Sequence, residues 1–275
     1  MSACKLSLLS VLLCTLTACS GQQRPKAATV AQKITVPTPP AVLTTPEQKA
    51  EFIATHYWDN FDFADTTLIS DAGVTEQAFA DFVNLLPYVP ETLIEKGVDA
   101  MMSKATVDSA MYAHFVELSE KYLYDPNSPM RNEEIYIVVL QNIVANPTLD
   151  EINKIRPCYQ LELALKNRVG DRATDFAYTT EKGGKAKLYS TAGDPLLLFF
   201  FRPDCPTCKE VKEYVKKNGI DKKVKIIYVN PDTDIHLDTI YDLRASPTLY
   251  LLDKDKKVIL KDAPIEQIET HIKNN

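Results

Sequence analysis

Two cysteines separated by two residues give this sequence its clearest chemical signal. Cys205 and Cys208 follow directly on six consecutive large apolar residues, 196–201. This apolar run is too short for a long helix and is bounded by prolines, which predicts a strand buried on both faces. Beyond Cys208 the apolar residues recur at helical spacing. A strand, a tight turn with Cys-x-x-Cys and a helix together indicate dithiol redox chemistry.

The expected position of Cys205, at the first turn of the helix, favours its thiolate form. Unpaired backbone N–H groups and the positive end of the helix dipole stabilise an anion there. The same position lowers a thiol pKa from its free value of about 8.5. Pro206 suits the first helical position, where an N–H has no helical partner anyway. Cys208, one turn further on, is expected to be more shielded and to resolve the mixed disulfide that Cys205 forms.

A half zinc site is the structural alternative for the same pair of cysteines. A structural zinc needs four protein ligands. The sequence contains no second Cys-x-x-Cys and no His-x-x-x-His. Redox function without a metal is therefore the prediction for Cys205 and Cys208.

The first residues are expected to be a targeting signal rather than part of the fold. Lys5 precedes a short apolar segment, 6–16, well below the about 20 residues of a membrane span. The segment ends in Leu-Thr-Ala-Cys, which resembles the lipobox of bacterial lipoproteins. That resemblance implies a signal peptide at 1–18, cleaved before Cys19, which then carries a membrane-anchoring lipid. Ordinary secretion with a free Cys19 is the alternative.

The remaining cysteines and the charge set further bounds. Removal of the signal discards Cys4 and Cys14, and Cys158 lies in a helical pattern that predicts a buried, inert thiol. The net charge of −6 gives no reason to expect a nucleic-acid partner. The acidic excess falls in residues 47–168, whereas 169–275 is close to neutral. This asymmetry favours two domains with different surfaces.

The chain is predicted to contain a proline-rich tether at 19–45, a helical domain at 46–168 and an α/β domain at 169–275. Thr45 and Thr148 each begin a capping-box pattern, and Pro46 suits a helix start. The expected helices of the bundle lie at 45–58, from 75, and at 90–104, 106–124, 131–145 and 148–167. The expected strands lie at 186–189, 196–201, 224–229, 248–252 and 257–260, with further helices after Cys205, at 237–243 and at 264–273.

Several motifs of the C-terminal part resemble the thioredoxin fold. Besides the Cys-Pro-Thr-Cys motif, Ala-Ser-Pro-Thr at 245–248 leads an apolar strand, with Pro247 42 positions after Cys205. In thioredoxin-like proteins a cis-proline at that place faces the dithiol. The resemblance implies that Ser246 and Pro247 contact the substrate. Within the dithiol motif, Pro206 and Thr207 are expected to do the same.

Two other stretches add to the resemblance. Residues 169–176 resemble the corresponding segment of membrane-anchored extracytoplasmic thiol–disulfide reductases and of peroxiredoxins. The peroxidatic motif Pro-x-x-x-Thr-x-x-Cys is absent before Cys205, which argues against a peroxiredoxin proper. Residues 57–65, 124–129 and 166–171 look like a bacterial domain of unknown function that precedes thioredoxin-like domains in exported lipoproteins.

The chain departs from the thioredoxin pattern at two positions. Asp204 replaces the usual tryptophan before the first cysteine, and its carboxylate would tend to raise the pKa of Cys205. Thioredoxins bury an aspartate six residues before the nucleophile, where this chain has Phe199. A proton of Cys208 must therefore pass to water or to another group, such as Glu210.

Together these features predict an extracytoplasmic thiol–disulfide oxidoreductase, with a helical bundle followed by a thioredoxin-like fold. No cofactor is required, because Cys205 and Cys208 carry the electrons. The resemblance favours a reductase acting on protein disulfides or thiols, supplied by a membrane electron donor. Ser20 after Cys19 favours the outer membrane, facing the periplasm. Two alternatives remain: a ligand- or partner-binding lipoprotein with a regulatory disulfide, and a metal chaperone that uses the two cysteines with His236.

Overall fold

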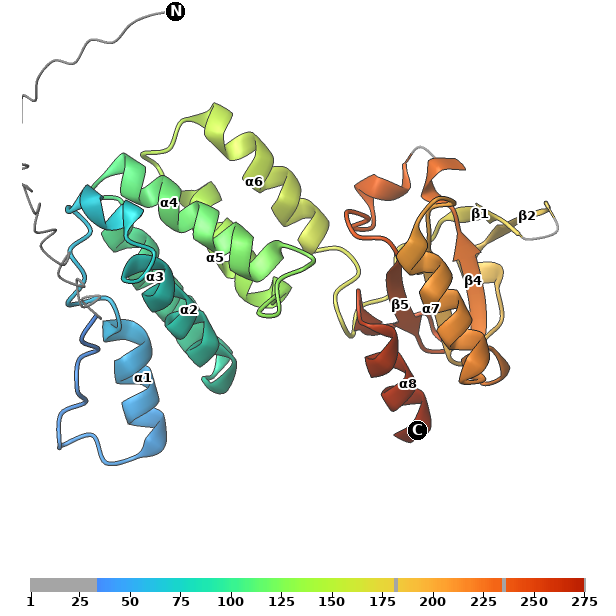
Figure 1. The fold of residues 1–275 in the computed structure, drawn as a ribbon, viewed down its shortest axis with the longest axis horizontal. Helices are drawn as coiled ribbons and strands as arrows, with labels where there is room; N and C mark the ends of the chain where they lie inside the picture. Colours follow the sequence, from blue (N-terminus) through green and yellow to red (C-terminus); the bar gives the residue numbers. More distant parts are fainter. Residues whose placement is uncertain (1–33, 181–182, 234–235, 275) are drawn as a thin grey trace, which may run out of the picture. The chain divides into compact units, whose positions relative to one another are not determined.

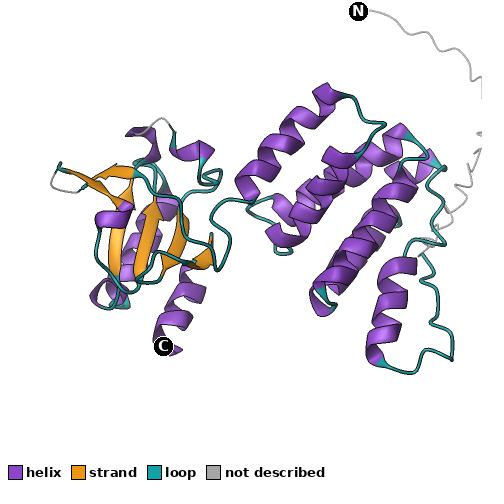
Figure 2. Ribbon diagram, turned by 180° about the vertical axis from the view of Figure 1, so that it is seen from behind, coloured by secondary structure: helices purple, strands orange, loops and turns teal. Residues whose placement is uncertain are grey.

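The computed structural model of the 275-residue chain describes residues 34–180, 183–233 and 236–274. The predicted signal peptide and Cys19 lie outside the described residues. Within those ranges, no helix is long and apolar enough to cross a membrane. A helical region is followed by a region that contains the sheet, as Figure 2 shows by colour, and both belong to one compact unit.

Within residues 34–168, six α-helices form the helical region, in agreement with the predicted bundle. They are α1 (Pro46–His56), α2 (Thr75–Leu85), α3 (Glu91–Ala105), α4 (Ser109–Ser119), α5 (Glu133–Ala145) and α6 (Glu151–Ala164). A π-helical turn, Glu120–Tyr124, continues α4. Thr45 and Gln48 form the expected capping box at the start of α1.

The second predicted capping box does not form. The N-cap of α6 is Asp150, and its side chain makes no capping hydrogen bond. The Thr148 hydroxyl donates instead to Oδ1 of Asn146, at 2.8 Å. Local hydrogen bonding of this kind competes with helix capping, because Asn and Thr side chains readily stabilise turns.

Aromatic side chains form the centre of the helical region. The ring of Trp58 packs edge-on against Phe61, Phe82 and Phe115, with ring centroids 5.1–5.5 Å apart. All four side chains are buried. At Gly97, a Cβ atom would lie 2.9 Å from the Ala54 carbonyl oxygen, so glycine permits the close approach of α3 and α1.

Part of the predicted tether lies on this core. Ile34 and Val36 pack against the hydrophobic core of the helical region. The Asn60 side chain donates to the Thr35 carbonyl oxygen at 2.6 Å. Apolar burial and this hydrogen bond explain why residues 34–36 lie against the helical region.

A carboxylate links α2 to the π-helical turn and makes stability depend on pH. Glu76 accepts hydrogen bonds from Lys121 and from the Tyr122 hydroxyl, the latter at 2.8 Å. These bonds lower the pKa of Glu76. A carboxyl with a lowered pKa in the folded state stabilises that state above its unfolded pKa, and this contribution disappears as pH falls through the folded pKa.

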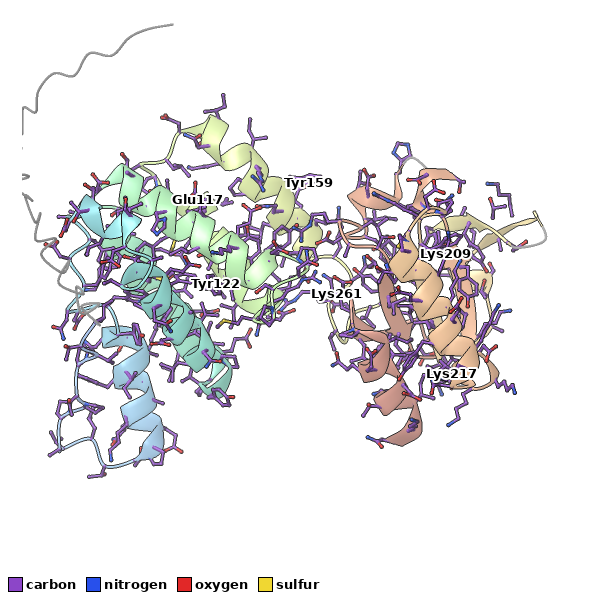
Figure 3. All side chains as sticks on the ribbon, viewed as in Figure 1. Glu117, Tyr122, Tyr159, Lys209, Lys217 and Lys261 are labelled. Carbon is purple, nitrogen blue, oxygen red and sulfur yellow. A yellow bond between two sulfur atoms is a disulfide. The ribbon has the colours of Figure 1, made fainter. Side chains whose placement is uncertain are left out.

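We therefore expect Glu76→Gln to lower the free energy of unfolding by about 1 kcal/mol at pH 7, through weakened hydrogen bonds. The difference from the unmodified chain should shrink below about pH 4, which urea unfolding at pH 7 and pH 3 would measure. Glu117→Gln is the matched control, because Glu117 is an exposed carboxylate on α4 (Figure 3). A difference of the same size at both pH values would contradict the assignment.

The C-terminal region is built on a four-stranded sheet in the order β4-β3-β5-β6. The strands are β3 (Leu196–Phe200), β4 (Lys225–Val229), β5 (Thr248–Leu252) and β6 (Val258–Lys261). β3 pairs parallel with β4 and antiparallel with β5, and all five of its residues are buried. The prediction of an interior strand buried on both faces is confirmed.

Different elements cover the two faces of this sheet. Leu197 and Phe199 of β3 pack with α7 (Pro206–Lys217) and α8 (Ile265–Asn274). Figure 1 shows both helices beside the sheet. Leu198 and Phe200 face a second cluster, supplied largely by residues 173–188 and 237–243. Successive side chains of β3 point into these two clusters in turn. Packing on both faces therefore fixes the end of β3, from which the chain enters the dithiol motif.

Some short elements of this region were predicted wrongly from the sequence. The expected strand at 186–189 is shorter and earlier, β2 (Lys185–Lys187), and pairs with β1 (Ala177–Thr179), which was not predicted. The expected helix at 237–243 is only a 3-10 turn, Leu237–Thr239. Elements of three residues carry too little periodicity to be recognised from sequence.

Candidate active site

The first cysteine of the dithiol motif occupies the N-cap of α7. The Cys208 N–H donates to Cys205 Sγ at 3.0 Å, and Pro206 takes the first helical position. Cys205 is half-buried, whereas Pro206 and Thr207 are exposed. One sulfur therefore sits at a helix N-terminus, within reach of a partner molecule.

The second cysteine is shielded. Cys208 is 2% exposed and belongs to the cluster beneath α7. A disulfide joins it to Cys205. The two sulfurs thus differ in accessibility, as dithiol exchange requires of an attacking and a resolving thiol.

The Ser246–Pro247 loop faces both cysteines. Its peptide bond is cis. The Ser246 carbonyl oxygen lies 3.3 Å from Cys205 Sγ, and the Ser246 hydroxyl lies 3.1 Å from Cys208 Sγ. The structure therefore brings together Cys205, Cys208 and Ser246, which the sequence analysis had grouped.

The residues that depart from the thioredoxin pattern differ in their exposure to solvent. Asp204 and Glu210 are both exposed. Phe199 is fully buried, and the Lys212 ammonium lies 5.7 Å from its ring centroid and 3.4 Å from that of Phe201. The hydroxyl of Ser246 is a polar group in contact with the shielded sulfur. Sequence reasoning assigned Ser246 only to substrate contact and missed this second position.

The segment that leads to Ser246 is held by the helical region. The Tyr159 hydroxyl donates to the Asp238 carbonyl oxygen at 3.2 Å, and Lys166 Nζ donates to the Thr239 carbonyl oxygen at 2.9 Å. The Asn167 side chain donates to the Ile240 carbonyl oxygen at 2.5 Å. Three side chains of one region thus fix consecutive carbonyl groups of residues 238–240.

Arg244, two residues before Ser246, adds a further contact. Its guanidinium lies 3.2 Å from the ring centroid of Tyr124 and donates to the Tyr124 carbonyl oxygen. It also forms an ion pair with Asp242 at 2.7 Å. Burial alone would raise the pKa of Asp242, but the hydrogen bonds and charge of Arg244 lower it below its ordinary value.

Two largely buried ion pairs join the helical region to the C-terminal region. Arg131 pairs with Asp262, and Glu133 pairs with Lys261 at 2.5 Å. Lys261, labelled on β6 in Figure 3, also donates to the carbonyl oxygens of Ala164 and Lys166. Burial raises the pKa of both Asp262 and Glu133, despite the neighbouring cations. Each of these charged side chains is largely removed from water and has a partner of opposite charge, unlike the residues of a surface ion pair.

Other candidate groups are not assembled into a site. Cys158 is half-buried on α6 rather than buried as predicted, because α6 presents apolar residues on more than one side. His236 is exposed. Across the described parts of the chain, no group of three or more His, Cys, Asp or Glu side chains is arranged to hold a metal ion.

The fold and the dithiol together define a thioredoxin-like oxidoreductase. A family model described as DUF5106, a domain of unknown function, matches residues 14–167, and the AhpC/TSA family matches residues 169–261. A crystal structure of a thioredoxin-like protein from Bacteroides caccae ATCC 43185 is 39% identical, with a TM-score of 0.79. The match covers 88% of this chain and 98% of that one. The chain therefore belongs to the DUF5106 family and carries a C-terminal thioredoxin-like domain.

Shorter solved structures resemble the C-terminal region alone. The C-terminal domain of an uncharacterized protein from Bacteroides fragilis NCTC 9343 is 32% identical, covering 39% of this chain and 98% of that one, with a TM-score of 0.33. The thioredoxin domain of a thiol-disulfide oxidoreductase from Bacteroides vulgatus is 16% identical, covering 38% of this chain and 98% of that one, with a TM-score of 0.32.

Proposed function

We propose that this protein is an extracytoplasmic, lipid-anchored thiol–disulfide reductase that exchanges electrons through Cys205 and Cys208. The observation that carries the proposal is the placement of a half-buried Cys205 at the N-cap of α7, with Cys208 shielded behind it. In the reduced protein, the Cys208 N–H and the helix end stabilise the Cys205 thiolate, which is the nucleophile of exchange.

The order of the reaction steps follows from the difference in accessibility between the two sulfurs. The Cys205 thiolate attacks one sulfur of a substrate disulfide, and the other substrate sulfur leaves as a thiolate. Cys208 then attacks Cys205, which releases the second substrate thiolate and closes the 205–208 disulfide. Two electrons pass to the substrate, and a membrane electron donor must reduce the disulfide again. No cofactor takes part, because the sulfurs carry the electrons.

The proton of Cys208 has a path through Ser246. Its hydroxyl lies 3.1 Å from Cys208 Sγ, close enough to relay the proton that Cys208 must lose before it attacks, accepting it while the hydroxyl's own proton passes to water. We expect Ser246→Ala to slow resolution of the mixed disulfide about tenfold, as loss of one such interaction would. Rapid-quench alkylation would measure this step, with Ser246→Thr as a control that keeps the hydroxyl. Equal rates for Ser246→Ala and the unmodified chain would exclude this path.

A redox titration of the purified protein against glutathione tests the function directly. Thiol alkylation should reveal one reversible two-electron transition, lost when Cys205 or Cys208 is replaced by serine. A potential near about −270 mV would agree with a reductase, whereas one near about −120 mV would indicate an oxidant. Absence of a transition would overturn dithiol exchange itself.

The location rests on the N-terminal sequence. The lipobox-like Leu-Thr-Ala-Cys ending at Cys19 supports a lipid anchor, and Ser20 supports the outer membrane, facing the periplasm. Metabolic labelling with a fatty-acid analogue, compared between the unmodified chain and Cys19→Ala, tests the anchor. Label retained by Cys19→Ala would contradict it.

A further inference from the structure

Exposed apolar side chains concentrate on and just after α6. Among the described residues, nine large apolar side chains are exposed, and five of them fall between residues 152 and 169. Ile152, Ile155 and Tyr159 are 74%, 66% and 49% exposed. Their spacing of three and four residues places them on one face of the helix. A contiguous exposed apolar face of this kind is typical of a surface that meets another protein.

This stripe, defined as Ile152, Ile155 and Tyr159, continues into a groove of about 560 Å³. Tyr159 and Leu163 of α6 form one side of the groove. Leu243 and Arg244 contribute from the segment that precedes Ser246. The groove is therefore lined by the helical region and by the segment that leads to Ser246.

Arg202 also lines the groove and lies three residues before Cys205, the first residue of the dithiol motif. In the described chain, the Arg202 guanidinium has no acidic partner, and the carboxylates of Asp232 and Asp238 have no cationic one. Unpaired charges of both signs fit a polypeptide, whose backbone and side chains offer donors and acceptors, better than a small anion, which the carboxylates would repel.

We propose that the stripe and groove are the docking surface for the protein disulfide substrate of Cys205. This inference rests on the proposed function and assigns the helical region a role in it. An extended segment beside the substrate cysteine lies in the groove, and its apolar side chains cover Tyr159 and Ile155. The occupant follows from the place of two lining residues, because Arg202 lies three residues before Cys205 and Arg244 two residues before Ser246, so a chain lying there is close to the half-buried sulfur.

Peptide disulfides provide a direct test on the reduced full-length protein. Two octapeptides carry a central cysteine in a disulfide with thionitrobenzoate, one flanked by leucine and phenylalanine and the other by serine. Cys205 attacks the peptide sulfur, thionitrobenzoate leaves as a coloured anion, and Cys208 then releases the peptide thiol. Since both peptides have the same leaving group, a difference in second-order rate constant reports docking. We expect the apolar peptide to react about tenfold faster.

Variants of α6 decide whether the stripe causes this preference. Ile152→Ser with Ile155→Ser should abolish it, while leaving the rate with the peptide-free reagent, dithiobis-nitrobenzoate, unchanged. Tyr159→Phe should retain the preference, which separates the ring from its hydrogen bond to Asp238. Tyr88→Ser is the matched control, because Tyr88 is 82% exposed and does not line the groove. Circular dichroism establishes that each variant is folded.

The outcomes separate the two proposals. If the unmodified chain shows no preference, or if the double variant keeps it, the docking surface is overturned although dithiol exchange stands. Equal loss in Tyr88→Ser would also overturn it, because the effect would not belong to α6. Failure to react with the peptide-free reagent as well would instead overturn the proposed function.

Discussion

Replacing Cys208 by serine is expected to leave the protein able to attack a disulfide but unable to release the product. Cys205 remains half-buried at the N-cap of α7, so its thiolate can still form a mixed disulfide. No thiol is left at position 208 to resolve it. The adduct should therefore accumulate to nearly one equivalent, which mass spectrometry after mixing with insulin would detect under non-reducing conditions.

Replacing Cys205 by serine has a different expected result. Cys208 is only 2% exposed, so it cannot readily reach a protein disulfide. Reductase turnover should fall at least about a thousandfold, to the level without protein, and no adduct should form. An adduct on Cys208 in the Cys205→Ser variant would reverse the assigned roles of the two sulfurs.

Replacing Arg131 by glutamine is expected to lower the free energy of unfolding by about 3 kcal/mol at pH 7. Arg131 pairs with Asp262 and lies 3.9 Å from Asp242, and all three side chains are largely buried. Its removal leaves two buried carboxylates with less compensating charge. Denaturant unfolding would measure the loss. Arg168→Gln is the control, since its ion pair with Glu134 is exposed and contributes at most about 1 kcal/mol.

The same variant should also change how stability depends on pH. Burial raises the pKa of Asp262 in the folded protein above its unfolded value. Such a group favours folding most below its unfolded pKa, and this contribution is lost as pH rises through the folded pKa. Without Arg131 that folded pKa rises further, so the destabilisation should be smaller at pH 4 than at pH 7. A loss of equal size at both pH values would show that Asp262 is not responsible.

Local patterns in the sequence predicted the dithiol and the elements that carry it. The run 196–201 is apolar without interruption, and an apolar period of 3.6 begins after Cys208, so strand and helix were both recognisable. The prediction that Pro247 faces the dithiol came from the resemblance to thioredoxin-like proteins and not from a local pattern in the sequence. The capping box at Thr45 formed and the one at Thr148 did not, because a neighbouring asparagine competed for the hydroxyl.

Contacts between distant parts of the chain were beyond sequence reasoning. Arg131 and Asp262 are 131 residues apart, and neither stands in a recognisable motif. The hydroxyl of Ser246 approaches Cys208 only because the sheet brings the start of β5 next to the end of β3. The exposure of the apolar stripe on α6 could not be predicted, since periodicity marks a face of a helix without saying what covers it.

The unequal burial of the two sulfurs also bears on damage by oxidants. A peroxide molecule can reach Cys205 far more easily than Cys208, so the first oxidation should produce a sulfenic acid at Cys205. Cys208 is the neighbouring thiol, and condensation of the two expels water and yields the 205–208 disulfide. That product is reducible, whereas sulfinic and sulfonic acids are not readily reversed. The shielded thiol therefore protects the accessible one from permanent inactivation during each encounter with peroxide.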